Sequence, residues 1–344
     1  MSDIVSVCQH YFVFLPTMST LSTHIYTTGD MLPQGVLTGN FFHSPALFAM
    51  SQLTPKHKPY MITVEDEGHG VVAQMLALVR YRSSLFPPYF YMHCHVLGEG
   101  VYSNLTADSP TSLFGMMLQA LCTRLNNHVL YLEVSNLSQK MFGYREFREN
   151  KFFPVRWMSI HNSLHSKEPS ERLLPTTKEH IATAYKRGVV TKEIETEAEF
   201  AAFSKLLRHH NWFKPRRYVP HDAFFRQIRE SGNGRLCVTS FKGRVIGCSA
   251  VVFSQRQAYL WYSAFRRKSF AWLHPDDVTI WHAIESAYQQ GYEHIYFMDV
   301  GLPFSKNPFR EFILSFGGKP VSTYRWFRCP IRWINAVLTW IYRE

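Results

Sequence analysis

The chain of 344 residues lacks the features that hold small secreted domains and membrane proteins together. It has only six cysteines and no CxxC pair, which excludes a disulfide framework as the basis of the fold. No stretch approaches 18 consecutive apolar residues, so no membrane-spanning helix is expected. The first residues show no basic segment ahead of an apolar one, which argues against a signal peptide. These absences predict a reduced, cytoplasmic protein.

Signatures of metal and nucleophilic chemistry are also missing. The two imidazoles of His93-Cys94-His95 fall on one face of an expected strand, but no third and fourth ligand stands at a recognisable spacing. No Ser/His/Asp or Cys/His set has a recognisable spacing either. The sequence therefore predicts no metal site.

Acidic residues are outnumbered by basic ones. The 37 Lys and Arg against 26 Asp and Glu give a formal net charge of +11. This charge favours an anionic partner such as CoA, a nucleic acid or an anionic lipid surface, without choosing among them. Hydrophobic residues make up 46% of the chain, enough for two cores, and the length is typical of two domains.

Hydrophobic periodicity and turn residues give the two halves of the chain the same order of elements. Each half reads as a hairpin, a strand, a helix beginning at a proline, a short strand, a helix and a strand. The residues repeat as well, because Tyr144-Arg-Glu-Phe147 matches Phe309-Arg-Glu-Phe312 and each is followed by an Arg-Trp pair, at Arg156-Trp157 and Arg325-Trp326. We interpret the halves as products of a duplication.

The expected boundaries follow from these elements. They are 1–165 for the N-terminal domain, 166–191 for a linker or crossover, 192–328 for the C-terminal domain and 329–344 for a C-terminal amphipathic helix.

The segment from Ala258 to Gly318 carries the most specific pattern. An aromatic strand, Ala258-Tyr-Leu-Trp-Tyr-Ser263, is followed by a helix, by Tyr296-Phe-Met-Asp-Val-Gly301 and then by Phe309 to Gly318. This order resembles the Gcn5-related N-acetyltransferase (GNAT) superfamily, and two such units in tandem resemble its FemAB-like branch. The resemblance implies an α/β (α+β) fold of two tandem GNAT-like domains, each with a mixed, mostly antiparallel sheet flanked by helices.

The resemblance further implies an N-acyltransferase, which moves an acetyl or aminoacyl group from a CoA thioester or an aminoacyl-tRNA to an amine. The amine would belong to a small or lipid-linked acceptor such as a cell-envelope precursor. GNAT proteins hold the CoA pyrophosphate in a glycine-rich loop at a helix N-terminus. Here Phe265 to Pro275 replaces that loop, and Arg266, Arg267 and Lys268 are the expected cofactor-binding residues.

The donor stays open between acetyl-CoA or another acyl-CoA and aminoacyl-tRNA. The missing glycine loop disfavours the first, and the missing helical arm of tRNA-using relatives disfavours the second. A nucleic acid is expected as a partner only if tRNA is the donor.

Asp299 and Tyr262 are the expected catalytic residues. Asp299 ends a buried strand, where sites gather in open α/β sheets, and would deprotonate or orient the amine. Tyr262 would protonate the leaving group. The alternatives are a loop cap for Asp299 and a core position for Tyr262. Glu133 is the counterpart of Asp299 by element order, either a relic of duplication or a second carboxylate between the halves.

The expected substrate-binding residues are basic or aromatic. Trp212, Arg216 and Arg217 lie in a loop that borders the acceptor site in GNAT folds, and Lys306 and Arg310 follow Asp299. A surface loop with one buried tryptophan explains the first three about as well, and a solvated helix face explains Lys306 and Arg310 about as well.

The C-terminal segment, 328–344, combines apolar residues at helical spacing with Trp333, Trp340 and several arginines. One interpretation is a peripheral anchor on an anionic membrane at its inner face. The other is a terminal helix that packs its apolar stripe on the second unit, which base rates favour. The alternative function for the whole chain is a non-catalytic tandem GNAT-like module that binds a lipid-linked or glycan ligand.

Overall fold

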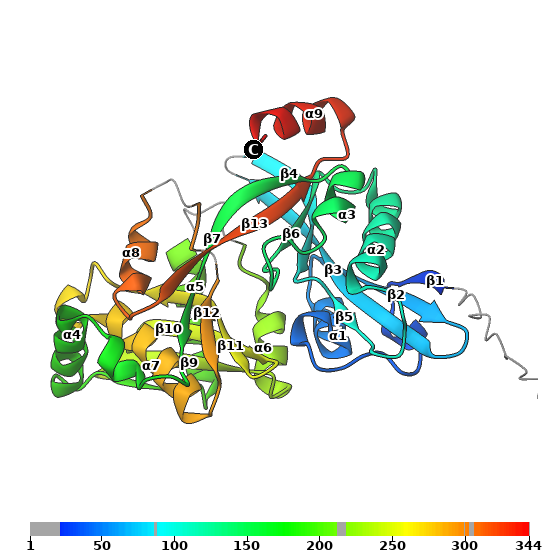
Figure 1. Cartoon of the computed structure of the whole chain (residues 1–344). Coiled ribbons are helices and arrows are strands. Elements are labelled where there is room, and N and C mark those ends of the chain that lie inside the picture. Colours follow the sequence, from blue (N-terminus) through cyan, green and yellow to red (C-terminus); the bar gives the residue numbers. More distant parts are fainter. Residues whose placement is uncertain (1–20, 86–87, 212–217, 299, 303–305, 344) are drawn as a thin grey trace, which may run out of the picture.

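The computed structural model describes residues 21–85, 88–211, 218–298, 300–302 and 306–343. Two lobes are visible, the N-terminal one in blue to green and the C-terminal one in green to orange, and the strands β7 and β13 cross between them (Figure 1). The predicted α/β fold with two GNAT-like units is confirmed.

The N-terminal half consists of strands with two longer and several shorter helices. Its elements are β1 Leu21–Tyr26, η1 Gly29–Met31, η2 Phe41–His43, α1 Pro45–Leu53, β2 His57–Asp66, β3 Gly70–Leu85, β4 Pro88–Leu97, β5 Val101–Tyr102, α2 Pro110–Leu125, β6 Tyr131–Ser135, α3 Tyr144–Glu149 and β7 Phe153–Ser163.

The C-terminal half repeats this order after two further helices. Its elements are η3 Pro169–Arg172, α4 Pro175–Lys186, β8 Val190–Glu193, α5 Glu197–Asn211, α6 Asp222–Glu230, β9 Gly234–Phe241, β10 Arg244–Ser254, β11 Gln257–Phe265, η4 Ala271–Leu273, α7 Pro275–Gln289, β12 His294–Phe297, α8 Pro308–Leu314, β13 Lys319–Arg328 and α9 Arg332–Ile341.

Local sequence signals fix several of these boundaries. α1 begins at Pro45 because the Ser44 hydroxyl accepts a hydrogen bond from the N–H of Leu47, at 3.2 Å. α2 begins in the same way at Pro110, where Ser109 caps the N–H of Ser112. The segment predicted to be a linker contains α4, whose buried Ala184 packs with Leu273 and Val278 of the C-terminal half.

One continuous sheet runs through both halves, in the order β1-β2-β3-β4-β6-β13-β7-β12-β11-β10-β9-β8. The last strand of each half lies in the sheet of the other half. β13 pairs with β6, and β7 pairs with β12, both antiparallel. β7 and β13 also pair with each other, from His161↔Lys319 to Phe153↔Phe327. The two halves therefore exchange their final strands.

The repeated Arg-Trp pairs mark the centre of this exchange. Val155 lies opposite Arg325, and Arg156 lies opposite Tyr324. Because the repeat equates Arg156 with Arg325 and Val155 with Tyr324, the two residue pairs are related by a local two-fold axis. The sequence repeat and the strand pairing thus describe the same duplication.

A shared core joins the two halves on one side of the sheet. It combines Leu47 of α1 and Leu78 of β3 with Phe224 of α6 and Trp261 of β11. The opposite face of the N-terminal sheet is covered by α2 and α3, and that of the C-terminal sheet by α7 and α8. The halves are one folded body, since neither closes its core alone.

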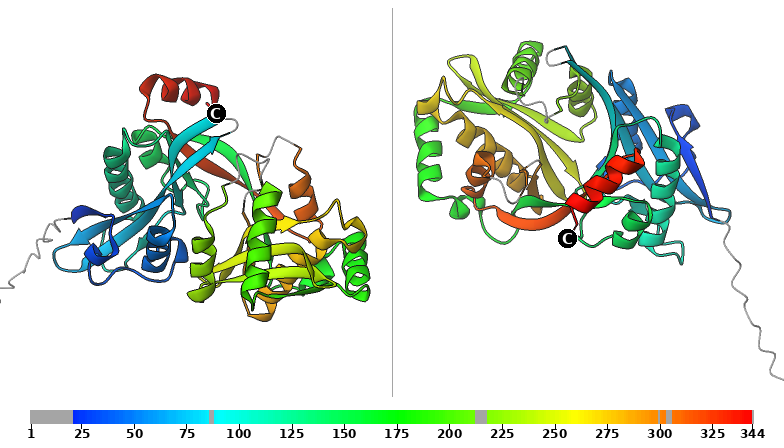
Figure 2. Two further views of the ribbon diagram at one scale, coloured as in Figure 1. Left: turned by 180° about the vertical axis from the view of Figure 1, so that it is seen from behind. Right: turned by 90° about the horizontal axis from the view of Figure 1, so that it is seen from above.

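The C-terminal helix α9 lies on the outside of the molecule beyond the end of β13 (Figures 1 and 2). Its buried residue is polar: Asn335 donates to the carbonyl of Lys151, at 2.9 Å, and accepts from the N–H of Cys329, at 2.8 Å. Trp333 and Trp340 are 71% and 72% exposed. The favoured expectation, an apolar stripe packed on the second unit, is wrong. No helix in the described ranges is long and apolar enough to cross a bilayer.

Candidate active site

A cavity of about 720 Å³ in the C-terminal half lies between α4, the first turn of α7 and α8. Its lining residues come from these helices and from the segments that lead into α7 and α8. They are Thr177, His180, Arg267, Asp277, Lys306, Asn307, Pro308, Arg310, Glu311, Phe312 and Ser315.

Asn307 and Arg310 attach the end of the β12 segment to α8. The Asn307 side chain accepts from the N–H of Phe309, at 3.0 Å, and donates to the carbonyl of Val300, at 2.8 Å. Arg310, which is buried, donates to the carbonyl of Leu302, at 2.7 Å. Gly301 has a φ of +88°, and a Cβ there would lie 2.5 Å from the Asn307 amide nitrogen, so glycine is required.

Carboxylates occupy the first turn of α7. Asp276 pairs with Arg267, at 3.0 Å, and both Asp276 and Asp277 are buried. Burial and the neighbouring charge of Asp276 raise the pKa of Asp277 to about 6, while His180 and Arg267 act in the opposite direction. A helix N-terminus favours negative charge, and here the chain supplies that charge itself.

The side chains of His180 and His274 both approach the carboxylate of Asp277. Their Nδ1 atoms lie 3.3 Å and 3.8 Å from one of its oxygens, and the two rings stack with centroids 3.9 Å apart and planes 11° apart. A metal ion lies in the ring plane of each histidine ligand. Two nearly parallel, stacked rings cannot both direct a nitrogen lone pair at one ion, so the three side chains do not fit a metal.

The parallel pair β11–β12 diverges beside this region. The ladder covers Gln257–Leu260 opposite His294–Phe297, and β11 continues to Phe265 beyond it. Leu260 and Tyr262 of β11 pair with the consecutive residues Val251 and Ala250 of β10. Trp261 between them is therefore an extra residue, and the register shifts there. Such a bulge bends a strand and re-aims its residues, often next to active sites. The ring of Phe265 contacts Phe312 of the cavity, with centroids 6.3 Å apart.

Residues 178–305 match the model of the acetyltransferase (GNAT) domain family. The C-terminal half belongs to the GNAT superfamily. The search of curated proteins gave no match.

The whole chain resembles several solved structures in its fold. FemX is 10% identical, with a TM-score of 0.59, covering 89% of this chain and 96% of that one. L-PGS from Bacillus licheniformis is 9% identical, with a TM-score of 0.53, covering 78% and 86%. A tandem GNAT protein from the clavulanic acid biosynthesis pathway is 10% identical, with a TM-score of 0.52, covering 90% and 99%. At these identities the likeness concerns the fold, and it agrees with the FemAB-like resemblance in sequence.

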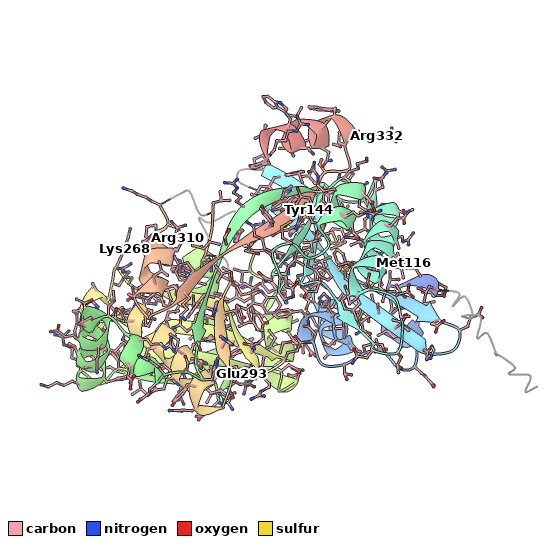
Figure 3. All side chains as sticks on the ribbon, viewed as in Figure 1. Met116, Tyr144, Lys268, Glu293, Arg310 and Arg332 are labelled. Carbon is pink, nitrogen blue, oxygen red and sulfur yellow. The ribbon has the colours of Figure 1, made fainter. Side chains whose placement is uncertain are left out.

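The cavity of the GNAT domain brings together three of the predicted binding residues, Arg267, Lys306 and Arg310. The other two members of the basic segment lie apart from it. Arg266 lines a smaller cavity of about 330 Å³ together with Lys205 and Arg244, and Lys268 is exposed. Arg310 and Lys268 both lie on the α8 side of the C-terminal half (Figure 3).

Tyr262 lies in the shared core of the two halves. It is 5% exposed, with its ring edge-on to Phe225 and stacked near Trp261. The other predicted site residues, Asp299, Trp212, Arg216 and Arg217, lie outside the described residues.

Glu133 of β6 connects the exchanged strand β13 to the N-terminal sheet. Glu133 accepts from Arg325 of β13, at 3.0 Å, and lies 3.7 Å from the Nε2 of His95. The Arg325 guanidinium also stacks on the Trp157 ring of β7, at 3.9 Å. Glu133 therefore holds β13 in the N-terminal sheet.

The cavity residues missed from the sequence include His180, Asp277 and Asn307. Asn307 has a local signal, because Asn-Pro is a helix start. Asp276-Asp277 after Pro275 also marks a helix start, but the burial of the pair has no local signal. His180 lies on α4, far from α7 in sequence, and only tertiary packing brings it to the site.

Proposed function

We propose that the C-terminal half transfers an acyl group, acetyl or aminoacyl, from a thioester or ester donor to an amine. The observation that carries this proposal is the continuation of β11 past the end of β12 to Phe265, whose ring lies beside Phe312 of the cavity that holds Arg267, Lys306 and Arg310. A strand that continues past its partner offers backbone groups to an extended, amide-bearing donor. The same N–H groups are suitable for a developing oxyanion.

In this reaction the amine nitrogen attacks the carbonyl carbon of the donor. A C–N bond forms and the C–S bond of a thioester, or the C–O bond of an aminoacyl ester, breaks. We assign Asp299 to accept or orient the proton of the amine. Tyr262 is packed in the shared core and does not line the cavity, so we assign no proton transfer to it. Positioning supplies most of the rate, because direct attack needs few catalytic side chains.

The donor is acetyl-CoA, another acyl-CoA or an aminoacyl-tRNA, with Arg267 and Lys306 as phosphate contacts. In GNAT folds the pyrophosphate usually binds at a helix start, but here Asp276 and Asp277 at the start of α7 would repel it. The phosphate contacts would therefore lie on the α8 side of the cavity.

Binding calorimetry with CoA and with an uncharged tRNA tests this assignment. Arg267→Ser and Lys306→Ser should each weaken donor binding by roughly 10-fold and lower its salt dependence. Lys268→Ser, an exposed neighbour outside the cavity, is the matched control and should have little effect. Equal losses for all three would mean that only general surface charge is involved.

We further propose that the acceptor is presented at an anionic membrane, which residues 328–344 contact. α9 is held to the body through its polar Asn335, so Trp333, Val337 and Trp340 face outward in a fixed orientation. The surrounding arginines, Arg328, Arg332 and Arg343, add positive charge. Interfacial tryptophans next to basic residues are typical of helices that lie in the headgroup region. A cytoplasmic protein with this face would meet the membrane from its inner side.

Flotation with vesicles of phosphatidylglycerol and phosphatidylcholine tests the membrane contact. The full chain should float with vesicles that contain phosphatidylglycerol and much less with pure phosphatidylcholine. Trp333→Ser combined with Trp340→Ser should abolish flotation without loss of stability, whereas Trp272→Ser, which removes another exposed tryptophan, should not. A dimer that disappears in the double variant would identify a second copy of the chain as the occupant and reject the membrane.

The second candidate function is a non-catalytic module that binds a lipid-linked or glycan ligand. The specific observation in its favour is that Asp276 and Asp277 fill the anion-binding start of α7 and that Arg267 is engaged with Asp276. A panel assay with acyl-CoA donors and aminoacyl-tRNA separates the two functions. Turnover that is lost in Asp299→Asn supports the enzyme; ligand binding with no turnover on any donor supports the module.

A further inference from the structure

Arg80 of β3 is a buried cation with no carboxylate partner in the part of the chain that the structure describes. It is 7% exposed. One guanidinium nitrogen lies 3.3 Å from the Nδ1 of His95, and the guanidinium carbon lies 5.1 Å from the ring centroid of Tyr218. Its Nε atom is buried and has no hydrogen-bond partner. A buried charge without a counter-ion is costly, which makes Arg80 a candidate for binding an anion.

Two neutral histidines flank Arg80 on the same face of the sheet. His57 of β2 and His93 of β4 lie directly opposite Arg80 on its two neighbouring strands. Burial and the charge of Arg80 lower the pKa of His57 to about 3 and that of His93 to about 2. The Nδ1 atoms of both rings are buried without a partner. The row therefore offers three unfilled polar positions and no negative charge.

Tyr218 brings the C-terminal half to this row. It follows the loop after α5, its hydroxyl lies 2.6 Å from the Nε2 of His57, and its ring is within cation–π distance of Arg80 and Arg82. When this hydroxyl donates to Nε2, the proton of the neutral His57 ring sits on Nδ1, which becomes a donor. Arg80 Nε and His57 Nδ1 are then two buried donors without a hydrogen-bond partner among the described residues.

We infer that Arg80, with His57 and His93, forms an oxyanion site between the two halves for a carboxylate or phosphate group of the acceptor. This inference rests on the proposed function, because it assigns the group to the amine substrate. A planar guanidinium binds either group through paired N–H donors. The site lies apart from the cavity of the GNAT domain and would select anionic acceptors.

Thermal unfolding of the full chain, with no donor present, tests the site independently of turnover. Inorganic phosphate should raise the Tm by about 2 °C or more over sodium chloride of equal ionic strength, since a ligand that binds only the folded state stabilises it. Acetate in place of phosphate distinguishes a carboxylate site from a phosphate site. If neither anion raises the Tm and titration calorimetry detects no binding, the inference is wrong, whatever the enzymatic assay shows.

Two methionine variants separate a ligand site from a structural contact. Arg80→Met should abolish the phosphate-dependent rise, and its Tm without anion should equal or exceed that of the wild type because an uncompensated charge is removed. Arg325→Met is the matched control: it leaves Glu133 without its ion pair, so the Tm should fall while the phosphate response persists. A large fall in Tm for Arg80→Met, or an unchanged phosphate response, would make Arg80 a structural residue instead.

Discussion

The two halves of the molecule share one element order but differ where their parallel strands meet. In the N-terminal half, β4 pairs with β6 from His93↔Tyr131 to the strand end at Leu97↔Ser135, and the N–H of Gly98 continues the contact at 2.7 Å from the Ser135 carbonyl. In the C-terminal half the ladder ends at Leu260↔Phe297, with one further bond from the N–H of Met298 to the Leu260 carbonyl, at 3.2 Å, and β11 continues to Phe265. The paired strands thus end together in one copy, whereas one strand outlasts its partner in the other.

The helices beside these strands, α2 and α7, differ in how they begin. Ser109 caps α2 through its hydroxyl, and no acidic residue lies in the first turn. α7 begins at His274, a non-glycine residue with a φ of 45°, and carries two buried carboxylates. Such backbone strain and buried charge accumulate at functional sites. We therefore expect the catalytic step in the C-terminal copy.

The largest expected loss of stability comes from truncating the tryptophans of the two exchanged strands, Trp326 of β13 and Trp157 of β7. Trp326 of β13 is fully buried in the N-terminal core and stacks on Phe147, with centroids 4.5 Å apart. Trp326→Ala should lower the free energy of unfolding by about 3–5 kcal/mol. Its repeat counterpart, Trp157, is only half-buried and stacks on Arg325, so Trp157→Ala should cost less than half as much. Urea unfolding measures both losses. Equal losses would show that the two exchanged strands contribute equally to stability.

The next effect concerns the equivalent arginines of the repeated motif. Arg310 is buried and holds the carbonyl of Leu302, whereas Arg145 is exposed and pairs only with Glu149. Arg310→Ala should lower turnover by about 10²-fold through misplacement of the β12 segment. It should also cost about 2 kcal/mol of stability. Arg145→Ala should change neither, and if it impairs turnover as much as Arg310→Ala, the N-terminal half takes part in the chemistry.

Acid should affect the N-terminal half first. Burial lowers the pKa of His43 to about 3, far below that of a histidine in the unfolded chain. Below about pH 6.5 the histidine therefore binds a proton in the unfolded state but not in the folded state. The free energy of unfolding then falls by about 1.4 kcal/mol for each pH unit. His57 and His93 act in the same direction. Hydrogen exchange at pH 7 and pH 5, corrected for intrinsic rates, should show β2–β4 losing protection before α7 does.

The smallest effects are expected at the two helix starts, and they have opposite signs. Ser109→Ala should cost about 1 kcal/mol at any pH through loss of the cap. The pKa of Asp277 is raised in the folded state, so its ionised form destabilises the fold above about pH 6 and not at pH 4, where it is protonated. Asp277→Asn should therefore be more stable than the wild type at pH 8, and the gain should vanish near pH 4. A gain that does not depend on pH would exclude ionisation of Asp277 as its cause.

Much of the fold was predictable because its signals are local. Prolines placed the starts of α2 and α7, and periodicity placed the strands of both halves. The candidate site was predictable in part: Arg267, Lys306 and Arg310 line one cavity, but Arg266 points to another and Lys268 to solvent. Three adjacent basic residues look alike in sequence, and only the turn that carries them decides which one enters the cavity.

The sequence by itself determined the order of elements, the repeat and the amphipathic nature of α9, since each depends on residues that are close along the chain. Only the tertiary structure decided that β7 pairs with β12 and β13 with β6, and that His180 lies next to Asp277. It alone also placed Arg80 in a buried position beside two neutral histidines. It also decided that α9 turns its tryptophans outward, because one buried asparagine binds a distant carbonyl. These features arise from pairing between residues far apart in the chain, which local patterns do not encode.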